Sequence, residues 1–137
     1  MDQIRVLCPY GTNIVYIRNP QHTCTFELDI SVVRDICGTL IAPHDFPAVG
    51  CLFGHDKDCF TLAGQVYDEL RLMYYDVTLY IRMDRTLDNP IVHILATTYP
   101  YACTTNGYPD YSTSTHYGLC ITQTDIPLIL TALERRT

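Results

Sequence analysis

The first third of the chain consists of short apolar stretches separated by turn-forming residues. Two apolar runs, 4–7 and 14–17, are each followed by proline, glycine or asparagine residues. Residues 23–28 alternate between apolar and polar side chains, with Phe26 and Leu28 on the same side. A period of two is typical of a half-buried strand, so the pattern predicts three strands joined as a hairpin or meander.

Helical spacing occurs in three places along the chain. Apolar residues recur every three or four positions over residues 30–41, where Asp29 offers an N-cap and Pro43 ends the pattern. The same spacing over residues 62–74 predicts a second helix. A closing helix is expected after Thr124, whose hydroxyl is suited to capping it.

Three later stretches have the character of strands. Residues 77–83 alternate most regularly, 91–96 form a short apolar run, and 118–122 form a last one. Residues 42–58, rich in proline, glycine and aspartate, predict a long loop around a short strand, and residues 97–117 break the apolar pattern. The predicted order is therefore three strands, two helices, three strands and a closing helix.

This order of elements predicts an α+β protein. We expect residues 1–137 to form a single layered globular domain, with about three helices packed on a mostly antiparallel sheet. A chain of 137 residues is long enough to bury one hydrophobic core. Its 47% hydrophobic and 18% charged residues argue against disorder.

The charge of the chain excludes some classes of partner. A formal net charge of −6 disfavours binding to nucleic acid and to anionic membrane surfaces, because both require clustered cations. No apolar run approaches the roughly 18 residues needed to span a bilayer. The first residues also lack the basic and then apolar pattern of a signal peptide.

The cysteines indicate a compartment. The chain has seven, an odd number, and they are spread without the rhythm of a disulfide scaffold. Such cysteines are typical of a reducing environment, where most serve as small buried apolar groups. We therefore expect an intracellular protein, cytoplasmic, nuclear or both.

The region 97–117 holds the strongest candidate contact surface. Its tyrosines are interleaved with threonine, serine, asparagine and glycine, a mixture that evolved binding loops use for large contact area and adaptable hydrogen bonds. An alternative is an edge hairpin whose tyrosines half-bury against the sheet. The predicted partner-binding residues are Tyr99, Tyr101, Tyr108, Tyr111 and Tyr117.

A structural zinc site is a further candidate. His44, Cys51, His55 and Cys59 follow one another within a loop-like segment, and two cysteines with two histidines make a suitable tetrahedral set. The spacing lacks a Cys-x2-Cys knuckle, and the neighbouring aspartates offer the histidines ordinary surface hydrogen bonds. No other cofactor is expected, because the glycines are isolated and form no phosphate-binding loop.

A cysteine nucleophile would make the chain an enzyme. It requires a thiolate beside an activating histidine, and the local pairs are Cys103 with His116 and Cys51 with His55. The alternative for any one of these cysteines is a buried packing residue. A small hydrolase or transferase is therefore an alternative function, and a structural zinc module is another.

Lysine is nearly absent. Lys57 is the only lysine among the nine lysine and arginine residues, so the chain offers almost no acceptor for ubiquitin or acetyl groups. Together with the tyrosine-rich segment, this favours a non-enzymatic module that binds a protein partner. By analogy, compact viral accessory proteins that redirect or inhibit host factors have this profile. Exposed strand edges also make a homodimer compatible with the sequence.

Overall fold

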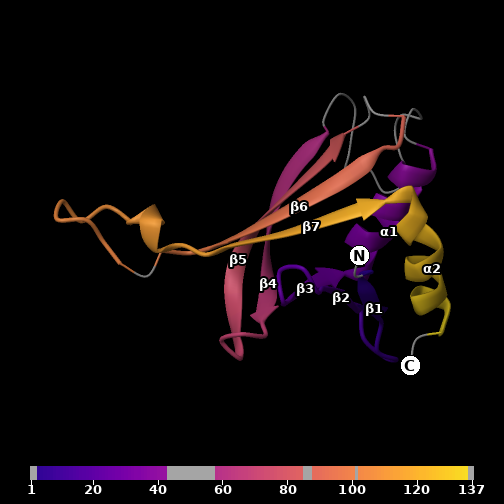
Figure 1. The fold of residues 1–137 in the computed structure, drawn as a ribbon, viewed down its shortest axis with the longest axis horizontal. Helices are drawn as coiled ribbons and strands as arrows, with labels where there is room; N and C mark the ends of the chain where they lie inside the picture. Colours follow the sequence, from indigo (N-terminus) through magenta and orange to yellow (C-terminus); the bar gives the residue numbers. More distant parts are fainter. Residues whose placement is uncertain (1–2, 43–57, 85–87, 101, 136–137) are drawn as a thin grey trace.

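The fold is a single antiparallel sheet with two helices on it. A computed structural model describes residues 3–42, 58–84, 88–100 and 102–135. Each strand lies beside the next strand in the sequence (Figure 1). The strands are β1 (Arg5–Leu7), β2 (Ile14–Asn19), β3 (Cys24–Asp29), β4 (Cys59–Asp68), β5 (Met73–Asp84), β6 (Ile91–Thr98) and β7 (His116–Thr122).

The sheet curves into a half-barrel around α1 (Ile30–Ile41), which packs against both β2–β3 and β6 (Figure 1). Contact with strands from both ends of the sheet places α1 on the concave side. The curvature also brings β2 close to β7, where the side-chain amide of Asn19 donates to the Gly118 carbonyl at 2.6 Å. The second helix, α2 (Ile126–Arg135), packs against β1.

The core lies between the concave face of the sheet and the helices. Along the strands, alternate side chains point inward and are buried, as the period of two requires. The convex face carries the other half of the side chains. The largest fully buried side chains are Val15, Ile17, Phe26, Leu28, Ile36, Leu40, Leu79, Ile81, Ile94, Ile121 and Ile129.

Several sequence predictions are confirmed. The three early strands form in the predicted places, as do the strands that contain residues 77–83, 91–96 and 118–122. The first helix covers residues 30–41, and the Asp29 carboxylate accepts a hydrogen bond from the Ser31 N–H at 2.8 Å. Asp29 therefore caps the helix as its position predicted.

The helix predicted over residues 62–74 is wrong, because this segment forms the end of β4, a turn and the start of β5. Leu62 and Val66 are four positions apart. This spacing places two side chains on the same face of a helix and also on the same face of a strand. The Asp68 carboxylate accepts from the backbone N–H groups of Leu70 and Arg71 at 3.0 and 3.1 Å, which fixes a tight turn. Leu72 completes the turn with a φ of 54°.

The closing helix forms, but it begins differently from the prediction. A short 3-10 turn, Gln123–Asp125, precedes α2, and Asp125 accepts a hydrogen bond from the Thr122 N–H at 2.9 Å. Thr124 is therefore not the cap. The described part of the chain holds two α-helices and two short 3-10 turns rather than about three helices. In that part, neither helix is long and apolar enough to cross a membrane.

A candidate partner-binding surface on the β6–β7 arm

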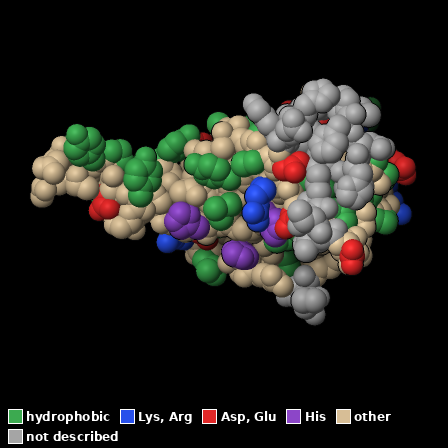
Figure 2. Space-filling model, turned by 90° about the horizontal axis from the view of Figure 1, so that it is seen from above, with side chains coloured by type: hydrophobic (Ala, Val, Ile, Leu, Met, Phe, Trp, Pro, Cys, Tyr) green, Lys and Arg blue, Asp and Glu red, His purple; other side chains and the backbone are tan. Residues whose placement is uncertain are grey.

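The segment between β6 and β7 projects from the sheet as a narrow arm (Figures 1 and 2). We define the arm as residues 99–115, of which Tyr101 lies outside the described residues. Near its tip the chain reverses at Gly107, which has a φ of 84°, a backbone conformation that suits glycine. The N–H of Thr104 donates to the Tyr108 carbonyl at 2.8 Å. This bond and the reversal at Gly107 make the tip a hairpin, as the Asn106-Gly107 pair indicates.

The base of the arm is also ordered by hydrogen bonds. Thr98 and Thr115 face each other, with the Thr98 N–H donating to the Thr115 carbonyl at 3.0 Å and the Thr115 N–H donating to the Thr98 hydroxyl at 2.7 Å. A 3-10 turn, Tyr111–Thr113, follows Asp110, whose carboxylate accepts from the Ser112 N–H at 3.1 Å. The arm is therefore a structured ribbon.

Three of the predicted contact tyrosines are exposed on this arm. The exposed fractions are 57% for Tyr99, 70% for Tyr108 and 69% for Tyr111. Hydrophobic side chains, a class that includes tyrosine, lie along the arm and at its base (Figure 2). A phenol ring exposed to this extent leaves most of its apolar area in water, so it gains free energy when a partner covers it.

A hollow of about 330 Å³ lies where the arm meets the convex face of β5 and β6. Tyr80 of β5 and Leu95 of β6 are exposed and lie opposite each other in the strand register. They extend the aromatic surface of the arm onto the sheet. The hollow is lined by uncharged residues: Thr78, Tyr80, Thr97, Thr98, Tyr99, Pro100, Pro109 and Tyr111.

Tyr117 does not belong to this surface, although it was predicted with the others. Its side chain is 4% exposed, and its hydroxyl donates to the Asp68 carboxylate at 2.7 Å. Tyr117 occupies an inward position on β7, in alternation with Leu119 and Ile121. Burial and the hydrogen bond to Asp68 raise the pKa of the Tyr117 phenol above its ordinary range.

The Asp68 contact links the base of the arm to the β4–β5 turn. Arg71, in that turn, donates to the Thr115 hydroxyl at 2.9 Å. Burial alone would raise the pKa of Asp68, but hydrogen bonds from Tyr117 and from the backbone N–H groups of Arg71 and Leu70 lower it. The charged carboxylate is thus held by several donors, and it fixes the arm where it leaves the sheet.

The predicted zinc ligands are not brought together among the described residues. His44, Cys51 and His55 lie outside them, and Cys59 is the exposed first residue of β4. Within the described ranges, no cluster of three or more histidine, cysteine, aspartate or glutamate side chains is arranged to hold a metal ion.

The structure pairs a cysteine with a histidine in a place the sequence did not indicate. Cys103 is exposed on the arm, while His116 contacts the Thr97 hydroxyl at 3.1 Å. Instead, the Cys120 sulfur lies 3.4 Å from Nδ1 of His93, across the β6–β7 register. Matching outward positions on the two strands would have suggested this pair. Burial and the Asp125 carboxylate raise the pKa of the Cys120 thiol, which disfavours a reactive thiolate.

Other cysteines have the inert character that the sequence predicts. Cys8, Cys24 and Cys37 are buried, and every cysteine in the described residues is a free thiol. Burial raises the pKa of Cys24 to about 12 and that of Cys37 to about 11. These thiols stay protonated and serve as packing groups.

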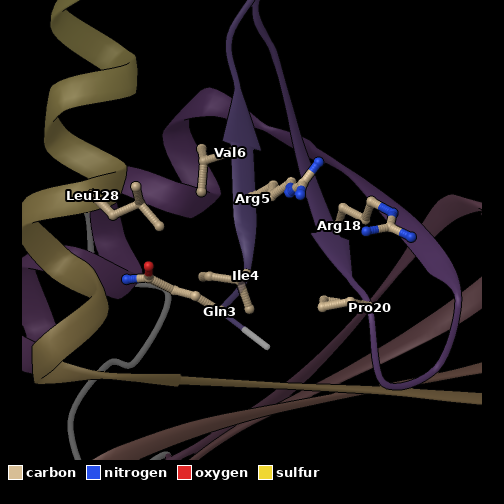
Figure 3. Close-up of a pocket in the computed structure, with 7 residues that line it drawn as sticks. All are labelled: Gln3, Ile4, Arg5, Val6, Arg18, Pro20 and Leu128. Atoms are coloured by element: carbon tan, nitrogen blue, oxygen red, sulfur yellow. The ribbon is translucent and has the colours of Figure 1, made fainter. Parts of the chain in front are cut away.

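A separate hollow of about 640 Å³ lies between α2 and the β1–β2 pair (Figure 3). Arg5 and Arg18 are opposite each other in the strand register and both line it. Arg18 also makes a bidentate ion pair with the Glu69 carboxylate. The charge of Arg18 is therefore already balanced by Glu69.

No protein-family model, curated protein or solved structure matches this chain.

Proposed function

We propose that this protein is a non-enzymatic interaction module that binds a protein partner through the arm. The observation that carries the proposal is the exposure of Tyr99, Tyr108 and Tyr111 on a hydrogen-bonded ribbon that projects from the body. Contact residues concentrate on loops held by a rigid scaffold. Tyrosine is also among the residues that contribute most to the energy of protein interfaces.

The chemistry of the arm supports a protein partner over a charged polymer. The hollow at its base is lined by aromatic rings, prolines and threonine hydroxyls, with no charged side chain among them. Such a surface buries apolar area and offers hydroxyl groups for hydrogen bonds, which resembles the composition of an interface core. A nucleic acid would instead need clustered cations.

The broader role is also part of the proposal. The near absence of lysine, the net charge of −6 and the free thiols support an intracellular protein that works beside the ubiquitin machinery without offering it acceptors. Redirection or inhibition of a host factor by a viral accessory protein is a role of this kind.

The experiment is affinity capture with a triple variant of the arm, in which Tyr99, Tyr108 and Tyr111 are each changed to serine. Quantitative mass spectrometry should identify at least one protein that the native chain recovers and that the triple variant recovers at least tenfold less. Loss of two or more interface anchors is expected to weaken binding by more than about thirtyfold.

The matched control is Tyr10→Ser, because Tyr10 is also highly exposed but lies between β1 and β2. The control should recover the same proteins as the native chain. Equal recovery of every protein by the native chain and the triple variant would contradict the proposal. Sedimentation of the purified protein tests in parallel whether the partner is a second copy.

One contact favours a second candidate, a small hydrolase or transferase. The 3.4 Å approach of the Cys120 sulfur to His93 is the geometry that a nucleophile and its base require. A thiol-reactive probe applied to the native chain and to Cys120→Ala distinguishes the two functions. Hyper-reactivity that disappears in the variant would support the enzyme, whereas ordinary reactivity would support the binding module.

A further inference from the structure

A second aromatic cluster lies on the convex face of β1 to β5. It surrounds a hollow of about 290 Å³ that shares no lining residue with the hollow at the arm. Three tyrosines from three different strands face this hollow, together with one carboxylate. The lining residues are Leu7, Tyr16, Thr25, Glu27, Tyr67 and Tyr74.

The strand register explains why these side chains meet. Tyr16 of β2 is directly opposite Glu27 of β3, and Tyr67 of β4 is directly opposite Tyr74 of β5. Thr25 lies opposite Tyr67 and joins the two pairs. All of these positions point outward, so directly opposite side chains are near neighbours on one surface.

The rings of Tyr67 and Tyr74 contact each other at an incline rather than as a face-to-face stack. The centroids of Tyr67 and Tyr74 are 4.8 Å apart, and their planes are inclined by 47°. Tyr74 is exposed, while Tyr16 and Tyr67 are half-buried. The face of an aromatic ring is the negative part of its charge distribution, so a cation that contacts a ring face is attracted to it.

The carboxylate gives the hollow a negative charge. The Glu27 backbone pairs with β2 and β4, but among the described residues its side chain makes no hydrogen bond or ion pair. Tyr16 lies directly opposite Glu27 and shares the hollow with Tyr74. Burial, then the Glu27 carboxylate and then Tyr74 raise the pKa of the Tyr16 phenol. Arg18 is two positions from Tyr16 on the same face, and it is bound to Glu69. A ligand in the hollow would therefore meet the charge of Glu27.

These features define the ligand. Ring faces and a carboxylate attract a cation, and the apolar walls favour a cation with an apolar surface. An ordinary ammonium group is strongly hydrated, so it loses more hydration than an N-methylated ammonium group does when it contacts ring faces. The volume is at the lower end of small-molecule sites, which start near roughly 300 Å³. We propose that this aromatic cage binds an N-methylated ammonium group, such as trimethyl-lysine or choline.

The test compares choline with its uncharged carbon isostere, 3,3-dimethylbutan-1-ol, by two-dimensional NMR of the native chain. Choline at up to about 50 mM should saturate shifts of backbone signals around Tyr16, Tyr67 and Tyr74, since millimolar dissociation constants are ordinary for so small a ligand. The isostere should bind at least about fivefold more weakly, because it lacks the charge. Sodium chloride at matched concentration controls for ionic strength.

Substitutions in the cage separate the attraction of the rings from mere apolar contact. Tyr74→Leu should weaken choline binding about tenfold, and Tyr74→Phe should change it less than about threefold, because the ring face is kept. Glu27→Gln should weaken choline binding and leave the isostere unchanged. Tyr111→Leu, on the arm, should change nothing. Thermal unfolding of each variant confirms that it is folded.

A pair of peptides identifies the source of the group. One carries trimethyl-lysine and the other unmodified lysine in the same sequence. Tighter binding of the trimethyl-lysine peptide than of choline would assign the site to a methylated protein segment, and equal binding would assign it to a small solute. Equal binding of choline and its isostere would overturn the proposal, as would the absence of any choline-specific shift. Neither result would bear on the arm, whose tyrosines lie elsewhere.

Discussion

At the scale of single residues, Asp68 is held by three hydrogen-bond donors from two parts of the chain. It is buried, yet its carboxylate is charged because Tyr117 and two backbone N–H groups donate to it. A buried charge of this kind is stable only while its donors are present. Asp68 therefore ties the stability of the sheet to the position of the arm.

Tyr117→Phe should destabilise the protein by about 1–3 kcal/mol, because it removes a hydrogen bond and leaves the Asp68 carboxylate with one donor fewer. Urea unfolding measures the change. Tyr111→Phe is the matched control, since Tyr111 is exposed, and it should change the free energy of unfolding by less than about 0.5 kcal/mol. Equal effects of the two substitutions would contradict the role assigned to the Tyr117 hydroxyl.

The same carboxylate predicts an acid dependence of stability. Folding lowers the pKa of Asp68 below its ordinary value of 3.8. The stability that this group contributes is therefore present above about pH 4 and is lost as the pH falls through the lowered pKa. Asp29 and Glu69 also have lowered pKa values, so their contributions must be subtracted.

Asp68→Asn makes that subtraction possible. The free energy of unfolding of the native chain should fall more steeply below about pH 4 than that of Asp68→Asn, since only the native chain loses the Asp68 contribution. Urea unfolding at several pH values gives both curves. Parallel curves would show that Asp68 has the same pKa in the folded and unfolded states.

At the scale of elements, the strands β4 and β5 occupy the segment where the sequence pattern predicted a helix. The spacing of Leu62, Val66 and Leu70 fits a helix, but Leu70 is exposed in the turn and only the first two share an inward face. Apolar residues four positions apart fit the helical period of about 3.6 residues and the strand period of two. Which element forms therefore depends on pairing with other strands. The helix 30–41 had no such ambiguity, because the residues that predict its beginning and its end, Asp29 and Pro43, lie close to it in the sequence.

Gly64 is a test of the β4–β5 pairing. A Cβ at this position would lie 2.5 Å from Cδ1 of the buried Leu79. Gly64→Ala should therefore destabilise the protein by about 1–3 kcal/mol. The cost should be smaller when Leu79 is also changed to alanine, which a double-mutant cycle of unfolding free energies would measure.

Gly38 provides the opposite case. It lies in α1, and a Cβ there would meet no atom within 4 Å. Gly38→Ala should stabilise the protein by about 0.5–1 kcal/mol, because alanine loses less entropy in a helix. Destabilisation by Gly38→Ala similar to that by Gly64→Ala would show that the contact with Leu79 is not the cause.

At the scale of the whole molecule, the arm is separate from the core. Among its described residues none is buried. Replacing residues 99–114 by Asn-Gly would join Thr98 to Thr115 by a two-residue hairpin turn, because those two threonines already face each other. The shortened protein should unfold with a free energy within about 1 kcal/mol of the native chain.

Denaturant unfolding of the shortened protein, together with affinity capture, checks this separation. Native stability with loss of the captured partner is the expected outcome. A loss of more than about 3 kcal/mol would mean that the arm contributes to the folding of the body and is not an appended surface.

Much of this architecture could be predicted from local patterns, and the sites could not. Alternation located most strands, and the hydroxyl-rich region around residue 100 was recognised by composition alone. Composition could not separate Tyr117 from Tyr108, because burial depends on the face of a strand that each side chain occupies. The hollow between Tyr16 and Tyr74 could not be predicted for a related reason. These two residues lie far apart in the sequence, and only the register of the intervening strands brings them together.

The order of the strands in the sheet has a consequence for biosynthesis. Each strand pairs with its predecessor in the sequence, so a growing polypeptide can add strands one at a time as they leave the ribosome. The pairings β1–β2, β2–β3, β4–β5 and β5–β6 close short loops and should form early, whereas β3–β4 and β6–β7 must close longer segments, 30–58 and 99–115. Until the next strand emerges, one edge of the nascent sheet is unpaired, and that edge is the vulnerable point for chaperone capture or aggregation.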